Sequence, residues 1–124
     1  MQVLIVEDDW LLAEQLRAAL AQGGHEIVGM TAEGVRALSV AETARPQVAL
    51  VDVALADGLS GTTVGAYLAR QGVAVIYLTG RVDEAVHDGR AHAVDILAKP
   101  YTPAELAQAL ARAEAQCLAG TEPS

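Results

Sequence analysis

The chain has 124 residues, 52% of them hydrophobic, which suits a single domain with a sizeable core and leads us to expect no second, output domain. Sixteen acidic against eight basic residues give a formal charge of -8, which disfavours direct binding to nucleic acid or to an anionic membrane surface. The single cysteine excludes an internal disulfide, and the apolar runs are too short to span a membrane. Because no signal-peptide pattern opens the chain, we expect a cytoplasmic protein. We expect its domain to span residues 1–118, with a frayed tail over 119–124, and the protein to be a monomer or a weak dimer.

Apolar runs of strand length alternate with longer segments of helical periodicity. This alternation predicts βαβ units and a parallel sheet covered by helices on both faces. We expect five strands, near residues 2–6, 25–30, 48–52, 73–78 and 93–98. We also expect five helices, over about 10–22, 32–44 and 61–71, a short and weak one within 82–90, and a last one that begins at 103.

Several residues mark where these helices end. Gly23 and Gly24 should close the first helix and Gly72 the third, because a residue without Cβ adopts the left-handed closing conformation at little cost. The second helix should stop before Arg45 and Pro46, since the residue before a proline avoids helical geometry.

Two helix starts carry capping signals. Thr102, Pro103 and Glu105 form a capping box at the start of the last helix. Asp9 is expected to begin or cap the first helix rather than to bind a metal.

Polar and charged residues follow four of the apolar runs. In chain order these residues are Glu7 and Asp8, then Asp52, Thr79 and Lys99. The carboxyl ends of parallel strands share one edge of a sheet, where such folds place their active sites. We therefore expect these side chains to gather around a single shallow pocket.

The three acids of this group favour a bound cation and phosphoryl chemistry. Carboxylates about 5 Å apart repel by on the order of 3 kcal/mol per pair, and Mg²⁺ with its preference for oxygen ligands would relieve that repulsion. One oxygen of Asp52 could then bind the metal while the other attacks phosphorus, giving an aspartyl phosphate. Lys99 and Thr79 would meet the charge on the phosphoryl oxygens, and Gly80 leaves room for the group.

These five ordered positions resemble those of a response regulator receiver domain of two-component phosphorelay signalling, over residues 1–118. The resemblance implies a flavodoxin-like, doubly wound sheet of strand order 2-1-3-4-5, with five helices. It implies a phosphoryl group taken from a histidine kinase or phosphotransfer protein, and an unknown downstream protein partner. It also implies the following roles: Glu7 and Asp8 as the acidic metal pair, Asp52 as phosphoacceptor and metal ligand, the Ala54 carbonyl in the metal shell, Thr79 as hydroxyl switch and Lys99 as the site lysine.

One position departs from the pattern of many receivers. They carry Tyr or Phe three residues before the lysine, where this chain has Ile96, so rotation of an aromatic ring there cannot be its switch. Tyr101 lies at a different position. The segment 77–81 resembles that of stand-alone receivers from alphaproteobacteria that also lack the aromatic. Our hypothesis is that the weak helix within 82–90 orders or shifts on phosphorylation.

Ordinary structural roles are expected for several other candidates. The three histidines lack paired metal-ligand spacing and should be surface or structural residues, and Cys117 is interpreted as incidental. Asp57 with Gly58 suits a turn. Trp10 either covers the start of the first helix or reports on metal occupancy, and the sequence favours neither. The histidines are His25, His87 and His92.

Three classes of function remain open from the residues alone. The leading one is a Mg²⁺-dependent phosphoacceptor, which is not a turnover enzyme. The second is a receiver-like docking module that works without phosphate. The third, a small enzyme or nucleotide binder, ranks last because no glycine-rich phosphate loop follows the first strand and Glu7-Asp8-Asp9 would repel a pyrophosphate.

Overall fold

The computed structural model describes residues 1–55, 60–80 and 92–121. Helices and strands alternate along the chain until β4 and β5, which are separated by residues outside the described part. The described elements are β1 (Gln2–Val6), α1 (Trp10–Gln22), β2 (Glu26–Thr31), α2 (Gly34–Ala44), β3 (Val48–Asp52), α3 (Gly61–Arg70), β4 (Ala74–Thr79), β5 (Asp95–Ala98) and α5 (Pro103–Thr121).

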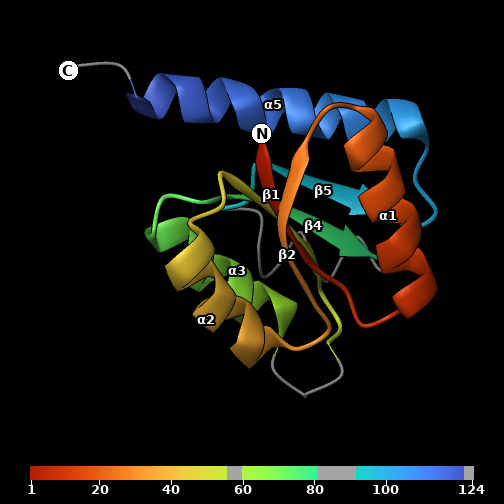
Figure 1. Ribbon diagram of the computed structural model, residues 1–124, viewed down its shortest axis with the longest axis horizontal. Helices are drawn as coiled ribbons and strands as arrows, with labels where there is room; N and C mark the ends of the chain where they lie inside the picture. Colours follow the sequence, from red (N-terminus) through yellow and green to blue (C-terminus); the bar gives the residue numbers. More distant parts are fainter. Residues whose placement is uncertain (56–59, 81–91, 122–124) are drawn as a thin grey trace.

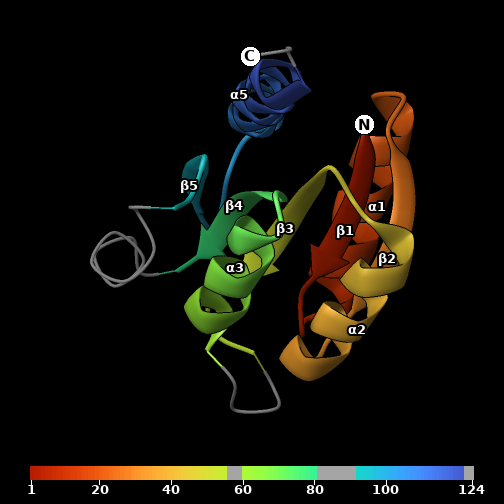
Figure 2. The same ribbon diagram turned by 90° about the vertical axis from the view of Figure 1, so that its left-hand side faces the viewer.

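The five strands form one parallel sheet of order β2-β1-β3-β4-β5 (Figures 1 and 2). The order reverses between β1 and β3, so their carboxyl ends lie at the crevice where open α/β sheets bind ligands. This architecture confirms the predicted flavodoxin-like fold and strand order.

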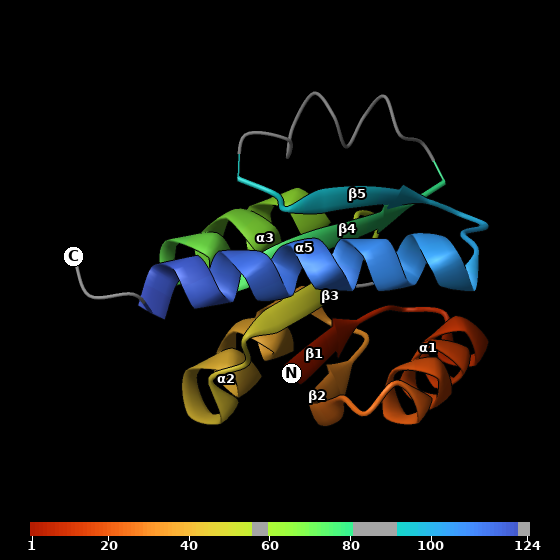
Figure 3. The same cartoon turned by 90° about the horizontal axis from the view of Figure 1, so that it is seen from above.

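Helices cover both faces of the sheet. Helices α1 and α5 pack on one face and α2 and α3 on the other, and α5 lies along β4 and β5 when seen from above (Figure 3). Successive strand residues alternate between the two cores: Val3 and Ile5 face α1 and α5, whereas Leu4 and Val6 face α2 and α3. All four are fully buried, and each such side chain contributes about 1.5–3 kcal/mol. Burial on both faces is the reason that the central strands β1, β3 and β4 appear in the sequence as nearly unbroken apolar runs.

The predicted element bounds agree with the structure to within two residues, apart from the end of the last helix. Helix α2 begins two residues later than expected, because Glu33 is extended and its amide donates to the Thr31 hydroxyl. Helix α5 continues to Thr121, so residues 119–121, which we expected in a frayed tail, are helical. The alanine-rich segment before them favours helix formation. The helix predicted within 82–90 lies outside the described residues.

The helix ends follow the predicted causes. Gly24 after α1 and Gly72 after α3 have φ angles of 86° and 87°, a region that favours glycine. Arg45 closes α2 in the left-handed conformation with φ 49°, directly before Pro46. The capping box of α5 is confirmed, since Thr102 and Glu105 each accept a hydrogen bond from the other's backbone amide.

Candidate functional site

The strand register brings the predicted acids together at the carboxyl edge of the sheet. Val6 of β1 pairs with Val51 of β3, so the next residues, Glu7 and Asp52, are neighbours. Carboxylate oxygens of Glu7, Asp8 and Asp52 all lie within 4.8 Å of one another. Glu7 and Asp52 are 3% and 5% exposed, whereas Asp8 faces solvent. Two of the three acids are thus removed from the water that would otherwise screen their charges.

Lys99 completes this group from the neighbouring strands. Thr79 ends β4 beside Ala98 of β5, and its carbonyl accepts the Lys99 amide at 2.8 Å. The Lys99 ammonium lies 2.7 Å from Glu7 Oε1 and 3.3 Å from Asp52 Oδ2. The described residues therefore bring together all five positions that the sequence singled out.

Backbone amides hold two of the carboxylates in place. The Ala54 amide donates to Asp52 Oδ1 at 3.0 Å, and the Asp9 amide donates to Glu7 Oε2 at 3.2 Å. The side chain of Asp9 instead accepts the amides of the first turn of α1 at 3.0 and 3.2 Å. Asp9 is therefore the N-cap of α1, as predicted from the sequence.

The electrostatics of the group favour one bound proton or cation. Burial raises the pKa of Asp52, and the neighbouring acids Glu7 and Asp8 raise it further, to about 8. Burial would also raise the pKa of Glu7, but hydrogen bonds with Asp52 and Lys99 outweigh it and lower that pKa. Burial opposes the charge of Lys99, yet its pairing with Glu7 and Asp52 raises the Lys99 pKa. Asp52 is the acid that gives up its proton least readily.

The donor set fits a hard divalent cation. Its three side chains offer carboxylate oxygens only, the ligands that Mg²⁺ prefers, and one exposed acid leaves the group open to solvent. Within the described ranges, no other cluster of three or more acid, histidine or cysteine side chains lies close enough to hold a metal.

The other candidates have structural surroundings. The ring of His25 contacts the amino terminus of Met1 at 3.0 Å, and the Cys117 thiol donates to the Gln47 carbonyl at 3.4 Å. Trp10 is 73% exposed at the start of α1. Residues 57, 81 and 87 lie outside the described part of the chain.

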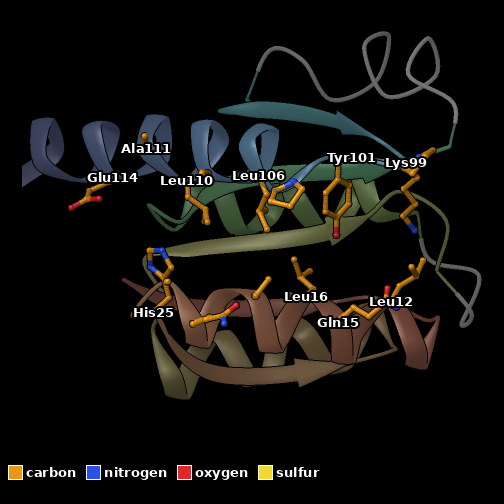
Figure 4. A pocket seen from close by; sticks show the side chains of 16 residues that line it. Leu12, Gln15, Leu16, His25, Lys99, Tyr101, Leu106, Leu110, Ala111 and Glu114 are labelled. Carbon is orange, nitrogen blue, oxygen red and sulfur yellow. The ribbon is translucent and has the colours of Figure 1, made fainter.

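Sequence reasoning missed two features near the site. One is a groove of about 870 Å³ between α1 and α5 that adjoins Lys99 (Figure 4). Leu12 and Leu16 line it from α1, opposite Leu106 and Leu110 of α5. The other is a hydrogen-bonded contact of the buried Tyr77, which is described below. A tyrosine in an otherwise aliphatic strand was the available signal, because a buried hydroxyl needs a partner.

The fold and the site together define an open α/β domain whose functional residues, the acids, a hydroxyl and a lysine, lie at the carboxyl edge of its parallel sheet. The profile of the response regulator receiver domain matches residues 3–111. The chain belongs to this family, as the resemblance predicted.

Individual relatives agree with this assignment. The chain is 32% identical over 114 residues to the phyllosphere-induced regulator PhyR of Methylorubrum extorquens, and 33% identical over 117 residues to a positive alginate biosynthesis regulatory protein of Pseudomonas aeruginosa. These matches cover 90% and 91% of this chain but only 43% and 47% of the relatives, so the chain spans less than half of their length.

Solved structures show the same fold. The signal receiver domain of a modulated diguanylate cyclase from Desulfovibrio desulfuricans has a TM-score of 0.86 and 31% identity, covering 96% of this chain and 97% of that one. The receiver domain of PhyR from Erythrobacter litoralis, solved by NMR, has a TM-score of 0.83 and 27% identity, covering 99% and 94%.

Membership of the family fixes the general setting. Receiver domains act in two-component signal transduction, generally bind Mg²⁺ at an acidic pocket, interact with histidine kinases and downstream effectors, and are not known as turnover enzymes. None of the described helices is both long and apolar enough to cross a bilayer.

Proposed function

We propose that this chain accepts a phosphoryl group on Asp52 from a phosphohistidine donor in a Mg²⁺-dependent reaction, and that it then signals by binding a downstream protein. The observation that carries the proposal is the placement of Asp52. Its carboxylate is buried within 4.8 Å of two other acids and lies 3.3 Å from the Lys99 ammonium.

In the proposed reaction, a carboxylate oxygen of Asp52 attacks the phosphorus of the donor. An O–P bond forms, the P–N bond to the donor imidazole breaks, and the released ring nitrogen takes the bonding electron pair and then a proton from solvent. The product is an aspartyl phosphate and a neutral histidine.

The residues around Asp52 have separate roles in this proposal. Lys99 meets the negative charge on the phosphoryl oxygens, and the Thr79 hydroxyl donates a hydrogen bond to one of them. The side chains of Glu7, Asp8 and Asp52 and the carbonyl of Ala54 would hold Mg²⁺, which supplies charge neutralisation when bound. Thr79 ends a strand whose neighbour delivers Lys99, and this register supports their joint action.

A protein donor is supported by the surface beside the site. The groove between α1 and α5 begins at Lys99 and is lined mainly by apolar side chains. A histidine kinase or phosphotransfer protein could contact this surface while its phosphohistidine reaches Asp52. We also propose that the protein acts in the cytoplasm, where a histidine kinase or phosphotransfer protein would present its phosphohistidine.

The test is incubation with acetyl phosphate, with and without Mg²⁺, followed by intact mass measurement at neutral pH. We expect the mass of one added phosphoryl group only with Mg²⁺, and none in Asp52→Asn. Asp9→Asn is the matched control: it neutralises a neighbouring acid, retains the helix cap, and should be phosphorylated like the wild type. Absence of any Mg²⁺-dependent addition would overturn the proposal and leave the docking module that works without phosphate.

A further inference from the structure

Tyr77 is a buried polar residue close to the site that the proposed chemistry does not use. It lies on β4, two residues before Thr79, and its side chain is fully buried. In the sheet it pairs with Val51 of β3 on one side and Ile96 of β5 on the other. An aromatic ring therefore occupies the strand beside Ile96, at the same level of the sheet.

The hydroxyl of Tyr77 joins two segments that are distant in sequence. It donates to the carbonyl of Thr62 in the first turn of α3 at 3.1 Å, and it is hydrogen-bonded to Nε2 of His92. The two rings meet edge to face, with centroids 5.5 Å apart and an interplanar angle of 80°. Burial raises the pKa of Tyr77, so the phenol keeps its proton. Because a phenol has a single hydrogen, Tyr77 can donate to Thr62 and at the same time accept from the His92 tautomer that carries its proton on Nε2.

Helix α3 is shaped to accept this ring. A Cβ on Gly65 would lie 2.0 Å from the Tyr77 hydroxyl and 2.5 Å from the ring carbon that carries it. Only glycine at this position allows the helix to approach the ring so closely. The contact between Tyr77 and α3 is therefore a specific fit rather than general apolar packing.

The first turn of α3, which contains Thr62, also touches the backbone of Asp52. The Gly61 amide donates to the Val53 carbonyl at 2.9 Å, and a Cβ on Gly61 would lie 2.0 Å from the Asp52 carbonyl oxygen. Thr62, which accepts the Tyr77 hydroxyl, is the next residue and is itself buried. A displacement of the Asp52 backbone must therefore move the first turn of α3.

We propose that Tyr77 is a positioning residue whose hydroxyl couples the state of Asp52, through the first turn of α3, to His92 at the entrance to β5. The proposal rests on the proposed function and deepens it, because it assigns a route for the phosphorylation signal in a chain that lacks an aromatic residue at Ile96. The route consists of contiguous contacts: Asp52 with Gly61, then Thr62 with Tyr77, and Tyr77 with His92.

The experiment uses NMR with beryllium fluoride and Mg²⁺ as the phosphoryl mimic. The readouts are the imidazole ¹H–¹⁵N signals of His92 and, as a local reporter, the Ala54 amide, which is bonded to Asp52 Oδ1. In the wild type we expect both to shift on addition of the mimic. In Tyr77→Phe, which removes only the hydroxyl oxygen, we expect the Ala54 shift to remain and the His92 shift to fall to less than about a third.

Tyr67→Phe is the matched control, because Tyr67 lies on α3 but is 47% exposed. It should respond like the wild type at both reporters. A wild-type His92 that stays unchanged while Ala54 shifts would overturn the inference alone, as would an undiminished His92 shift in Tyr77→Phe. An Ala54 amide that does not respond in the wild type would instead count against the proposed function.

A second variant tests the coupling from its other end, without altering Tyr77. Coupling free energies are reciprocal, and typical values correspond to about 5-fold to 150-fold changes in affinity. His92→Ala, on a half-buried residue, should therefore change the beryllium fluoride concentration at half saturation by about 5-fold or more. A midpoint within about 2-fold of the wild type would overturn the coupling even if Tyr77→Phe fails to fold.

Discussion

Neutralising Asp52 should stabilise the metal-free protein. At separations up to 4.8 Å and an effective dielectric of about 20, ionised Asp52 is repelled by Glu7 and Asp8 by about 3.5 kcal/mol each. The attraction between ionised Asp52 and the Lys99 ammonium at 3.3 Å offsets about 5 kcal/mol of this repulsion, at the same dielectric. The balance is about 2 kcal/mol against the ionised form, before the cost of burying the charge. Asp52→Asn removes this penalty, and its amide can still donate to Glu7.

The pH dependence follows from the raised pKa of Asp52. Its folded value of about 8 exceeds the ordinary value of 3.8, so the folded protein holds a proton that the unfolded chain has released between these two values. The stability that this proton contributes is complete below pH 4 and is lost as the pH rises toward 8. Glu7 has a lowered pKa and acts in the opposite sense, losing its contribution as the pH falls below its ordinary 4.5.

The assay is urea unfolding of the wild type and Asp52→Asn at several pH values in the presence of a chelator. We expect the two free energies of unfolding to agree near pH 4 and the variant to be more stable by at least about 2 kcal/mol at pH 8. Adding Mg²⁺ should narrow the gap, because the wild type binds it more tightly and gains more stability. A variant less stable than the wild type at pH 8 without Mg²⁺ would refute the reasoning.

Three further changes test other parts of the structure. Lys99→Ala removes a cation from the acidic group, so the Mg²⁺ affinity measured by calorimetry should rise about 3-fold or more. The rate of phosphoryl uptake from acetyl phosphate should fall about 100-fold, because the charge on the phosphoryl oxygens is no longer met. A loss of both Mg²⁺ affinity and phosphoryl uptake would contradict these two roles of Lys99. Asp9→Ala should lower the free energy of unfolding by about 1 kcal/mol without changing Mg²⁺ affinity, and Asp9→Asn should restore stability. Gly65→Ala should cost about 1–3 kcal/mol through its clash with Tyr77. Adding Tyr77→Leu should recover part of that loss, whereas strictly additive losses in urea unfolding would show that the two residues do not interact.

The fold was predictable because the three central strands, β1, β3 and β4, are buried on both faces. Runs such as 3–6 and 48–51 contain no polar residue, and only a parallel sheet between two helical layers buries every position of a strand. Helix ends were predictable where the signal is local, as at Gly24 and Asp9. The start of α2 was harder to predict, because its N-cap residue, Glu33, makes no side-chain hydrogen bond to the first turn.

The acidic group was predictable for a topological reason. Once the strands are parallel, the residue after each apolar run must lie at one edge of the sheet. Because β1 pairs with β3, this alone places Glu7 beside Asp52. The Tyr77 contact was not predictable in this way. Its partners Thr62 and His92 each lie 15 positions away, and the fit depends on the missing side chain of Gly65. Spacing along the chain carries no signal for such a contact.

The acidic group and the Tyr77 contact together give a physical reason for a switch at this edge of the sheet. A bound cation relieves the repulsion around Asp52, whereas a phosphoryl group adds negative charge there, and in both cases the forces on the Asp52 backbone change. The Asp52 backbone is closely packed against α3, because a methyl group on Gly61 would overlap the Asp52 carbonyl oxygen. A tightly packed contact transmits a small displacement instead of absorbing it. The first turn of α3 is therefore the element through which the charge state at Asp52 reaches the hydroxyl of Tyr77.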